Sequence, residues 1–475
     1  MLDFYIGYLH VELVENFGHH DMRALDPHER QPPEPSQPPA SVAARERPPS
    51  PGNGRIDARL LKAVFATSLL NGLELFDFTV FAFFGAIVGD RFFPFTQPMT
   101  SLLLAAATFG VGFLARPLGG LLLGAYADRC GRQPALLLSC WFATLGTAAI
   151  ALSPTYEQIG IAAPLLVVVS RVLQGLAVGG EIGPAAALAM EAAPPSKRGF
   201  VIGCQLAGHG IAPLFGASLG ALLSGMLTPT QLFDWGWRVA FAMGLPLIGI
   251  AYYLRRKLQE GGISDRTATG DARRRPVAQL FQHHRRIIAM ATLLMGFRTV
   301  PLYAVVYFLP TYMAHVIHQP MVNGFLASTL SAVLLIALSP AAGIVIDKLP
   351  RRKPLLFATA CGTAIGVYLL FVAMTPAATA ARLLIGIASI TALIVLGGCA
   401  ATVLVLEALP HNVRATGHGS TYALGAGMFG GTAQLAVAAL MKWTANPMSV
   451  AWYVVPCCLL SAGAAIAFNE RRAER

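Results

Sequence analysis

Runs of about 20 apolar residues, separated by short polar connections, fill most of the chain from Leu61 onward. A helix of that length crosses the hydrocarbon core of a bilayer. Within a bilayer the backbone must satisfy its own hydrogen bonds, so helices are the natural form for such runs. We therefore predict twelve membrane-spanning helices, at approximately 62–90, 100–125, 134–153, 160–190, 200–226, 237–255, 287–312, 324–346, 355–374, 382–405, 417–441 and 447–468.

The first 60 residues have a different composition. The segment RQPPEPSQPPASVAARERPPSPGNG (30–54) is rich in proline and charge and cannot bury enough apolar surface to fold alone. The segment before it lacks the basic start and continuous apolar run of a signal peptide. We predict that residues 1–60 form a disordered, proline-rich cytoplasmic tail.

Charge is scarce and unevenly placed. Only 12% of the 475 residues are charged and the mean hydropathy is +0.59, whereas soluble chains are about 25% charged. The basic residues concentrate on alternate connections (196–198, 255–286, 347–353 and 471–475), and the opposite connections carry few. This distribution follows the positive-inside rule with both termini in the cytoplasm. It accounts for most of the net charge of +11, so we expect no nucleic-acid partner.

The chain also repeats itself. EAAPPSKRG (191–199) and EALPHNVRATG (407–417) share the pattern E-x-x-P-x-x-x-R, and GAYADRCGRQPALL (124–137) has a weaker counterpart in GIVIDKLPRRKPLL (343–356). Two equivalent six-helix units in one chain are typical of transporters, with the substrate site between them. We predict an N-terminal half (61–255), a basic cytoplasmic linker (256–286), a C-terminal half (287–469) and a short cytoplasmic tail (470–475).

Several motifs resemble the major facilitator superfamily. The pattern G-x-x-x-D-R-x-G-R at 124–132 is similar to the loop signature of this superfamily. Five further stretches resemble its metabolite:proton symporter branch: NGLELFDF (71–78), FLARPLGG (113–120), RVLQGLAVGGEIG (171–183), WGWRVAF (235–241) and FLPTYM (308–313). Within that branch, 156–175 and 407–431 look closest to citrate and tricarboxylate carriers. The resemblance implies a monomeric proton symporter of the bacterial inner membrane that imports a small organic anion by alternating access.

The resemblance also implies a cytoplasmic latch between the halves, formed by Gly124, Asp128, Arg129, Gly131 and Arg132. The second copy would contribute Asp347 and Arg351, and we expect it to be weaker because it has Lys348 and Pro350 where the signature has Arg and Gly. We predict two further pairs at cytoplasmic helix ends, Glu191 with Arg198 and Glu407 with Arg414.

Charged residues inside the spans are candidates for function because burying them is costly. Arg116 and Arg298 come from different halves, and a guanidinium can bind a carboxylate through two hydrogen bonds. His209 adds a possible donor, and the other expected substrate-binding residues are Asn71, Gln174, Tyr303 and Tyr307. The alternatives are a helix-packing or latch role for Arg116 and a cytoplasmic-end position for Arg298, which also departs from the citrate carriers.

Proton coupling requires a carboxyl group whose protonation changes between states. We expect this group to be Asp77, paired with Arg171 in a manner that resembles an acid–arginine switch of proton-coupled sugar carriers. Glu74 and Glu181 are the next candidates, and Asn71, Glu74 and Asp77 share roughly one helix face. The alternative is a static buried ion pair that only fixes helix packing.

Other functions have less support in the sequence. There is no nucleophile triad, phosphate loop or metal-ligand spacing, including among the seven cysteines, so we expect neither an enzyme nor a metal site, and no cofactor beyond the proton gradient. The alternatives for the imported substrate are 2-oxoglutarate, shikimate, proline and betaine. A proton-antiport exporter would show G-x-x-x-G-P-x-x-G-G in helix five, which AGHGIAPLFGASLG (207–220) only approaches. A sensor on the same fold is a further alternative.

Overall fold

The computed structural model describes residues 58–94, 98–130, 132–179, 182–260, 285–317, 319–374, 380–410, 413–468 and 470. Over these residues the regular secondary structure is helical, with no strand, as the sequence predicted. Most of the predicted N-terminal tail and most of the predicted linker lie outside the described residues, and so does the C-terminal tail after Glu470.

The N-terminal half contains the first six spans, several of them divided into shorter helices. These are α1 (Ala58–Glu74), α2 (Phe76–Phe83), α3 (Gly85–Phe92), α4 (Pro98–Cys130), α5 (Arg132–Leu152), α6 (Tyr156–Ile159), α7 (Ala162–Val178), α8 (Ile182–Ala192), α9 (Arg198–Ala207), α10 (Ile211–Met226), α11 (Pro229–Gln231), α12 (Trp237–Ala242) and α13 (Gly244–Glu260). The predicted single helix 62–90 is therefore interrupted at Leu75 and Phe84.

The C-terminal half contains the other six spans. Its helices are α15 (Arg285–Leu302), α16 (Leu309–His315), α17 (Met321–Lys348), α18 (Lys353–Ala373), α19 (Ala380–Ala408), α20 (Arg414–Gly425), α21 (Gly431–Thr444) and α22 (Ser449–Ala467). Short π-helical segments at Tyr303–Tyr307 and Ala426–Gly430 join α15 to α16 and α20 to α21. Pro301 precedes the first of them and cannot donate a helical hydrogen bond.

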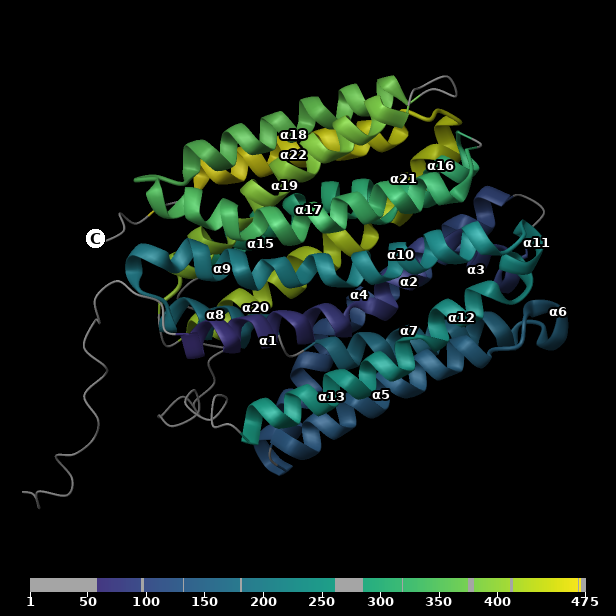
Figure 1. Cartoon of the computed structure of the whole chain (residues 1–475), viewed down its shortest axis with the longest axis horizontal. Helices are drawn as coiled ribbons and strands as arrows, with labels where there is room; N and C mark the ends of the chain where they lie inside the picture. Colours follow the sequence, from purple (N-terminus) through teal and green to yellow (C-terminus); the bar gives the residue numbers. More distant parts are fainter. Residues whose placement is uncertain are drawn as a thin grey trace, which may run out of the picture. The chain divides into compact units, whose positions relative to one another are not determined.

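Among the described residues, twelve apolar helical segments match the twelve predicted spans. Ten are long and apolar enough to cross a membrane, and two shorter apolar helices, Leu137–Leu152 and Ala162–Val178, correspond to spans three and four. In Figure 1, α18, α19 and α22 lie together on one side of the bundle, and α5, α12 and α13 on the other. The helices between them, α9 and α10 with α17 and α4 with α21, form the contact between the halves.

Small residues allow close contact between span five and α17. A Cβ atom at Gly203 would overlap the Ser339 carbonyl, and one at Gly210 would lie 2.8 Å from the Ala332 carbonyl oxygen. Membrane helices associate through such small residues, because packing rather than the hydrophobic effect holds them together. The contact follows both α9 and α10, so it runs along most of α17.

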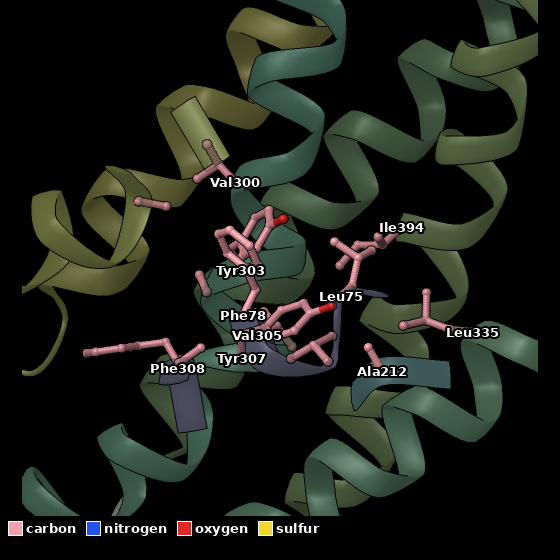
Figure 2. Close-up of a cluster of buried hydrophobic side chains, with 14 of the residues drawn as sticks. Leu75, Phe78, Ala212, Val300, Tyr303, Val305, Tyr307, Phe308, Leu335 and Ile394 are labelled. Atoms are coloured by element: carbon pink, nitrogen blue, oxygen red, sulfur yellow. The ribbon is translucent and has the colours of Figure 1, made fainter. Parts of the chain in front are cut away.

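The two halves also touch through aromatic side chains and at both ends of the bundle. Phe83 stacks on Tyr307 with ring centroids 5.8 Å apart, and Phe84 lies beside Phe325. Figure 2 shows Leu75, Phe78 and Ala212 of the N-terminal half grouped with side chains of the C-terminal half, Tyr303 and Tyr307 among them. Near one end Lys442 donates to Thr100, and near the other the carboxylate of Asp347 meets α9.

Candidate functional site between the two halves

Basic and aromatic side chains from both halves meet in the middle of the bundle. Arg116 lies on α4, and His209 lies in the short helical turn between α9 and α10. Arg298 on α15 and the π-helical Tyr303 come from the other half, and His209 lies within electrostatic range of both arginines. The structure therefore places His209 near each of the two arginines that the sequence proposed for anion binding.

Arg116 is almost completely buried, with 3% of its surface exposed. Its guanidinium carbon lies 3.8 Å from the ring centroid of Phe113 and 4.2 Å from that of Phe78. Its Nε and Nη2 atoms have no hydrogen-bond acceptor among the described residues, although the Tyr303 hydroxyl lies close to the group. Buried charges without partners are costly, so this guanidinium is suited to receive an anion.

Arg298 is less enclosed and faces partly away from the interface. Its Nη2 lies 3.8 Å from the Met295 sulfur, and its Nε has no acceptor. It also borders a cavity of about 30 Å³ within the C-terminal half, between α15, α18, α19 and α22. Arg298 therefore lies between His209 on one side and the cavity inside its own half on the other.

Two histidines flank one tyrosine of span eleven. The ring centroids of His209 and His418 lie 6.1 and 6.4 Å from that of Tyr422. His418 is 3% exposed and its Nδ1 has no partner. His418 lies near the start of α20, where the packing of this helix buries it, so it is a further candidate for the site.

The remaining predicted substrate-binding residues lie in different parts of the structure. Tyr303 and Tyr307 stack on each other with centroids 5.0 Å apart, beside Arg116. Asn71 lies partly buried on α1. Gln174 belongs to a different group of residues, around Asp77, because α7 directs it towards α5.

The predicted proton-coupling pair is linked indirectly. The Thr147 hydroxyl donates to Asp77 Oδ2, and Gln174 Nε2 donates to Thr147 Oγ1 at 3.0 Å. Gln174 Oε1 in turn accepts from Arg171 Nη1 at 2.6 Å. Thus a chain of neutral side chains separates acid and base where a direct ion pair had been predicted. Thr147 was missed because one hydroxyl in an apolar run gives little signal.

Asp77 and Arg171 are both buried, and each retains unused bonding capacity. Asp77 Oδ1 and Arg171 Nε and Nη2 have no hydrogen-bond partner in the part of the chain that the structure describes. Arg171 is instead surrounded by the rings of Phe78, Phe81 and Phe109, at 4.1, 4.5 and 5.7 Å from their centroids. A Cβ atom at Gly244 would strike Asp77 Oδ1, so this glycine makes room for the carboxylate.

The structure describes one of the other two acidic candidates. Glu74 is partly buried at the end of α1, three residues before Asp77 but across the interruption at Leu75. Glu181 lies outside the described residues.

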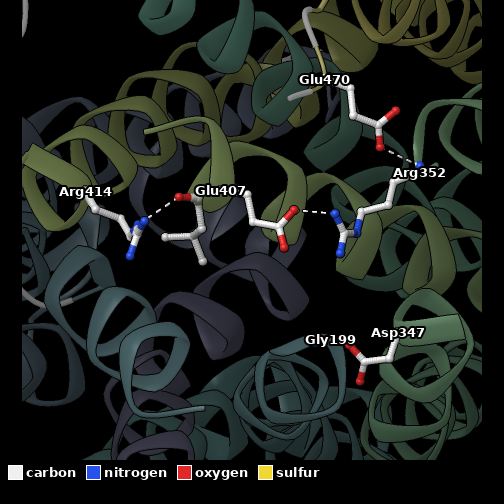
Figure 3. Close-up of polar contacts among 7 residues, drawn as sticks. Gly199, Asp347, Arg352, Glu407, Arg414 and Glu470 are labelled. Carbon is white, nitrogen blue, oxygen red and sulfur yellow. Dashed lines mark hydrogen bonds and ion pairs between the residues drawn. The ribbon is translucent and has the colours of Figure 1, made fainter. Parts of the chain in front are cut away.

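Only part of the predicted latch can be located. The backbone of α4 continues through Gly124, Asp128 and Arg129 to Cys130, but the side chains of Asp128, Arg129 and Arg132 lie outside the described residues, as does Gly131. The second copy is described. Asp347 accepts hydrogen bonds from the backbone N–H groups of Gly199 (2.6 Å) and Phe200 (2.9 Å), at the start of α9 in the other half (Figure 3).

Two ion pairs at this end join residues of different connections. Arg414 Nη1 lies 3.3 Å from Glu191 Oε1, which joins the two halves, and Glu407 pairs with Arg352. Arg351, the predicted latch residue, is exposed, and the backbone N–H of Arg352 donates to Glu470 (Figure 3). Arg198 Nε has no acceptor. Sequence spacing suggested pairs within one connection, whereas α8 and α20 bring Glu191 and Arg414 together.

Comparisons with known proteins agree with this architecture. A family model described as Major Facilitator Superfamily matches residues 67–433. The structure is similar to that of the xylose transporter XylE from E. coli, with a TM-score of 0.66, 17% identity, and coverage of 86% of this chain and 97% of that chain. At this identity the similarity concerns the fold.

Curated relatives are closer in sequence. The chain is 30% identical to a citrate-proton symporter of Klebsiella pneumoniae (82% of this chain, 88% of the relative) and 32% identical to one of Salmonella typhi (87% and 94%). It is 31% identical to the shikimate transporter of Escherichia coli K12 (84% and 92%). Similar identities to carriers of different substrates leave the substrate open. The chain belongs to the Major Facilitator Superfamily and shares its fold with proton-coupled transporters.

Proposed function

We propose that this protein imports a small carboxylate metabolite, citrate or a related tricarboxylate in the first instance, by symport with protons. The observation that carries the proposal is the buried Arg116, whose Nε and Nη2 have no acceptor among the described residues. His209 lies near both Arg116 and Arg298 of the other half. Two guanidinium groups from opposite halves suit a ligand with at least two carboxylates.

Two arginines placed in different halves suit transport by alternating access. A ligand held by both halves stabilises the state in which they close around it, and rocking of the halves exposes it to either side in turn. We propose that residues 61–255 and 287–469 are the two moving units, that 256–286 is their cytoplasmic linker, and that one chain is the functional unit.

Proton coupling follows from charge. Moving one charge against the membrane potential costs about 2.3 kcal/mol per 100 mV, so a trianion would cost about three times as much. At least three protons would make the net charge movement favourable or neutral. We propose Asp77 as one proton acceptor, because its Oδ1 is buried without a partner and Arg171 is reached only through Gln174 and Thr147.

Uptake into proteoliposomes tests the proposal. Purified protein is reconstituted, an inward pH gradient is imposed, and labelled citrate uptake is measured with tricarballylate, 2-oxoglutarate, shikimate or proline as competitor. Gradient-driven citrate uptake that tricarballylate inhibits best is the expected result. Inhibition by only one of the others would retain proton symport and reject the tricarboxylate. Absence of uptake of all of them by folded protein would contradict carboxylate import.

Two arginine variants test the binding site. Arg116→Ala and Arg298→Ala each remove charged hydrogen bonds to the ligand worth about 1.5–3 kcal/mol, so KM should rise about 10- to 100-fold. Arg91→Ala is the matched control, because Arg91 pairs with Asp234 away from the central cluster, and its KM should stay unchanged. Normal affinity in both central variants would reject binding by two arginines.

A further inference from the structure

One aromatic ring lies against both of the functional arginines. The ring centroid of Phe78 is 4.2 Å from the guanidinium carbon of Arg116 and 4.1 Å from that of Arg171. A cation near the face of an aromatic ring within about 6 Å is attracted by the ring quadrupole, most strongly where water is excluded. Phe78 is 3% exposed, so both contacts are dry.

The neighbouring rings contact only one arginine each. Phe113 lies over Arg116 alone, and Phe81 and Phe109 lie over Arg171 alone. Among the described residues, Phe78 is thus the ring shared by the proposed substrate-binding arginine and the proposed proton-coupling arginine. It is also the direct chain neighbour of Asp77, on the same short helix α2.

The ring has little room to move independently. Its centroid is 5.2 Å from that of Phe113, in an edge-to-face arrangement. A Cβ atom at Gly112 would lie 3.0 Å from Phe78 Cε1 and 3.2 Å from Arg171 Nη2, so α4 encloses the contact between them. A displacement of either guanidinium therefore has to be accommodated by Phe78. The charged groups that contact the ring or adjoin it in the chain are Asp77 on α2, Arg116 on α4 and Arg171 on α7. His209 and Tyr303 lie near Arg116 as well.

We propose that Phe78 is a positioning residue that couples the two sites by sharing its ring between Arg116 and Arg171. A carboxylate that draws Arg116 away from the ring leaves Phe78 free to follow Arg171. The position of Arg171 relative to Asp77 then depends on whether substrate is bound. This inference rests on the proposed function, because it assigns substrate to Arg116 and the proton to Asp77.

The test separates cation attraction from shape. In one variant Phe78 is replaced by 3,4,5-trifluorophenylalanine, which keeps the ring but weakens the negative potential on its face, and in the other by leucine (Phe78→Leu). Phe113→Leu and Phe81→Leu are the matched controls, since each removes a ring that touches one arginine only. Counterflow exchange at equal pH and steady-state accumulation under a fixed pH gradient are measured for the labelled carboxylate.

Both Phe78 variants should retain exchange and lose most of the accumulation, because substrate would then move without a fixed number of protons. Phe113→Leu should raise KM and keep the accumulation ratio, and Phe81→Leu should keep that ratio as well. Wild-type accumulation in the fluorinated variant would overturn the proposal, as would equal loss in Phe113→Leu.

A measurement without substrate distinguishes failure of this inference from failure of the proposed function. The infrared carboxyl band of Asp77, assigned by its loss in Asp77→Asn, is titrated in purified protein with and without Arg116→Gln. With the natural ring, Arg116→Gln should change the proton affinity of Asp77 by at least about threefold more than with the fluorinated ring, because a cation–π contact is strongest where water is excluded. Equal changes would reject the coupling role even if citrate uptake were observed. If no carboxylate were transported, a difference would support the coupling without the substrate assignment.

Discussion

Three buried residues decide how Asp77 is held. Thr147 donates to one carboxylate oxygen, Gly244 leaves space beside the other, and Gln174 connects the pair to Arg171. A residue-level reading of the sequence identified the acid and the arginine, but the two side chains that connect them depend on how α5 and α7 pack.

Asp77→Asn should abolish accumulation driven by a pH gradient while sparing exchange, because asparagine can keep the hydrogen bond with Thr147 but cannot exchange a proton. The measurement compares gradient-driven uptake with counterflow in the same proteoliposome preparation. Equal loss of both activities would count against a coupling role and favour a static structural role.

Thr147→Val should destabilise the protein, because it leaves a buried carboxylate without its hydroxyl donor at a cost of about 1.5–3 kcal/mol. Thr147→Ser keeps the hydroxyl and is the control. Thermal unfolding in detergent compares the two variants, and a Thr147→Val melting temperature equal to that of Thr147→Ser would show that this hydrogen bond contributes nothing.

Individual elements depart from ideal helices where the function is proposed. Span one is divided beside Asp77, and span seven passes through a π-helical turn that carries Tyr303 and Tyr307. Such turns insert a residue into a helix and are frequent at functional sites. Span five and α17, by contrast, stay close because glycines of span five lie directly against α17, with Gly199 facing Gly343 and Gly203 facing Ser339.

Gly203→Val should separate these two helices, since a side chain at this position overlaps the Ser339 carbonyl. Overpacking of this kind typically costs about 1–3 kcal/mol. The thermal unfolding midpoint should fall. Gly463→Val on α22 is the control, because a Cβ atom there meets nothing within 4 Å, and an equal fall in both variants would contradict the close-contact explanation.

At the scale of the whole molecule, a carboxylate at the end of a helix in one half accepts hydrogen bonds from the start of a helix in the other half. Asp347 lies in the last turn of α17, where negative charge is unfavourable for its own helix dipole, yet it binds the N-terminus of α9, where it is favourable. The Glu191–Arg414 pair crosses the same boundary but is partly exposed, so it should contribute less.

Asp347→Asn should therefore open this end of the protein. Loss of about 1 kcal/mol between a charge and a helix terminus changes a two-state population by about fivefold. Cys399 is a native reporter, because it is fully buried and its sulfur lies 3.7 Å from the Gly199 carbonyl oxygen. Mass spectrometry should detect faster thiol labelling of Cys399. Asp234→Asn is the control, since Asp234 pairs with Arg91 within one half, and unchanged labelling in Asp347→Asn would reject the latch.

The sequence by itself determined the twelve spans, their two-fold repetition and the residues that carry charge into the membrane. Those features are local, because hydrophobic run length and charge placement do not depend on which helices meet. Only the tertiary structure decided which groups are partners. Glu191 and Arg414 are 223 residues apart, Asp77 reaches Arg171 through a threonine on a third helix, and Phe78 meets two arginines from different spans. Side-chain pairing depends on helix rotation and packing, which sequence spacing does not encode.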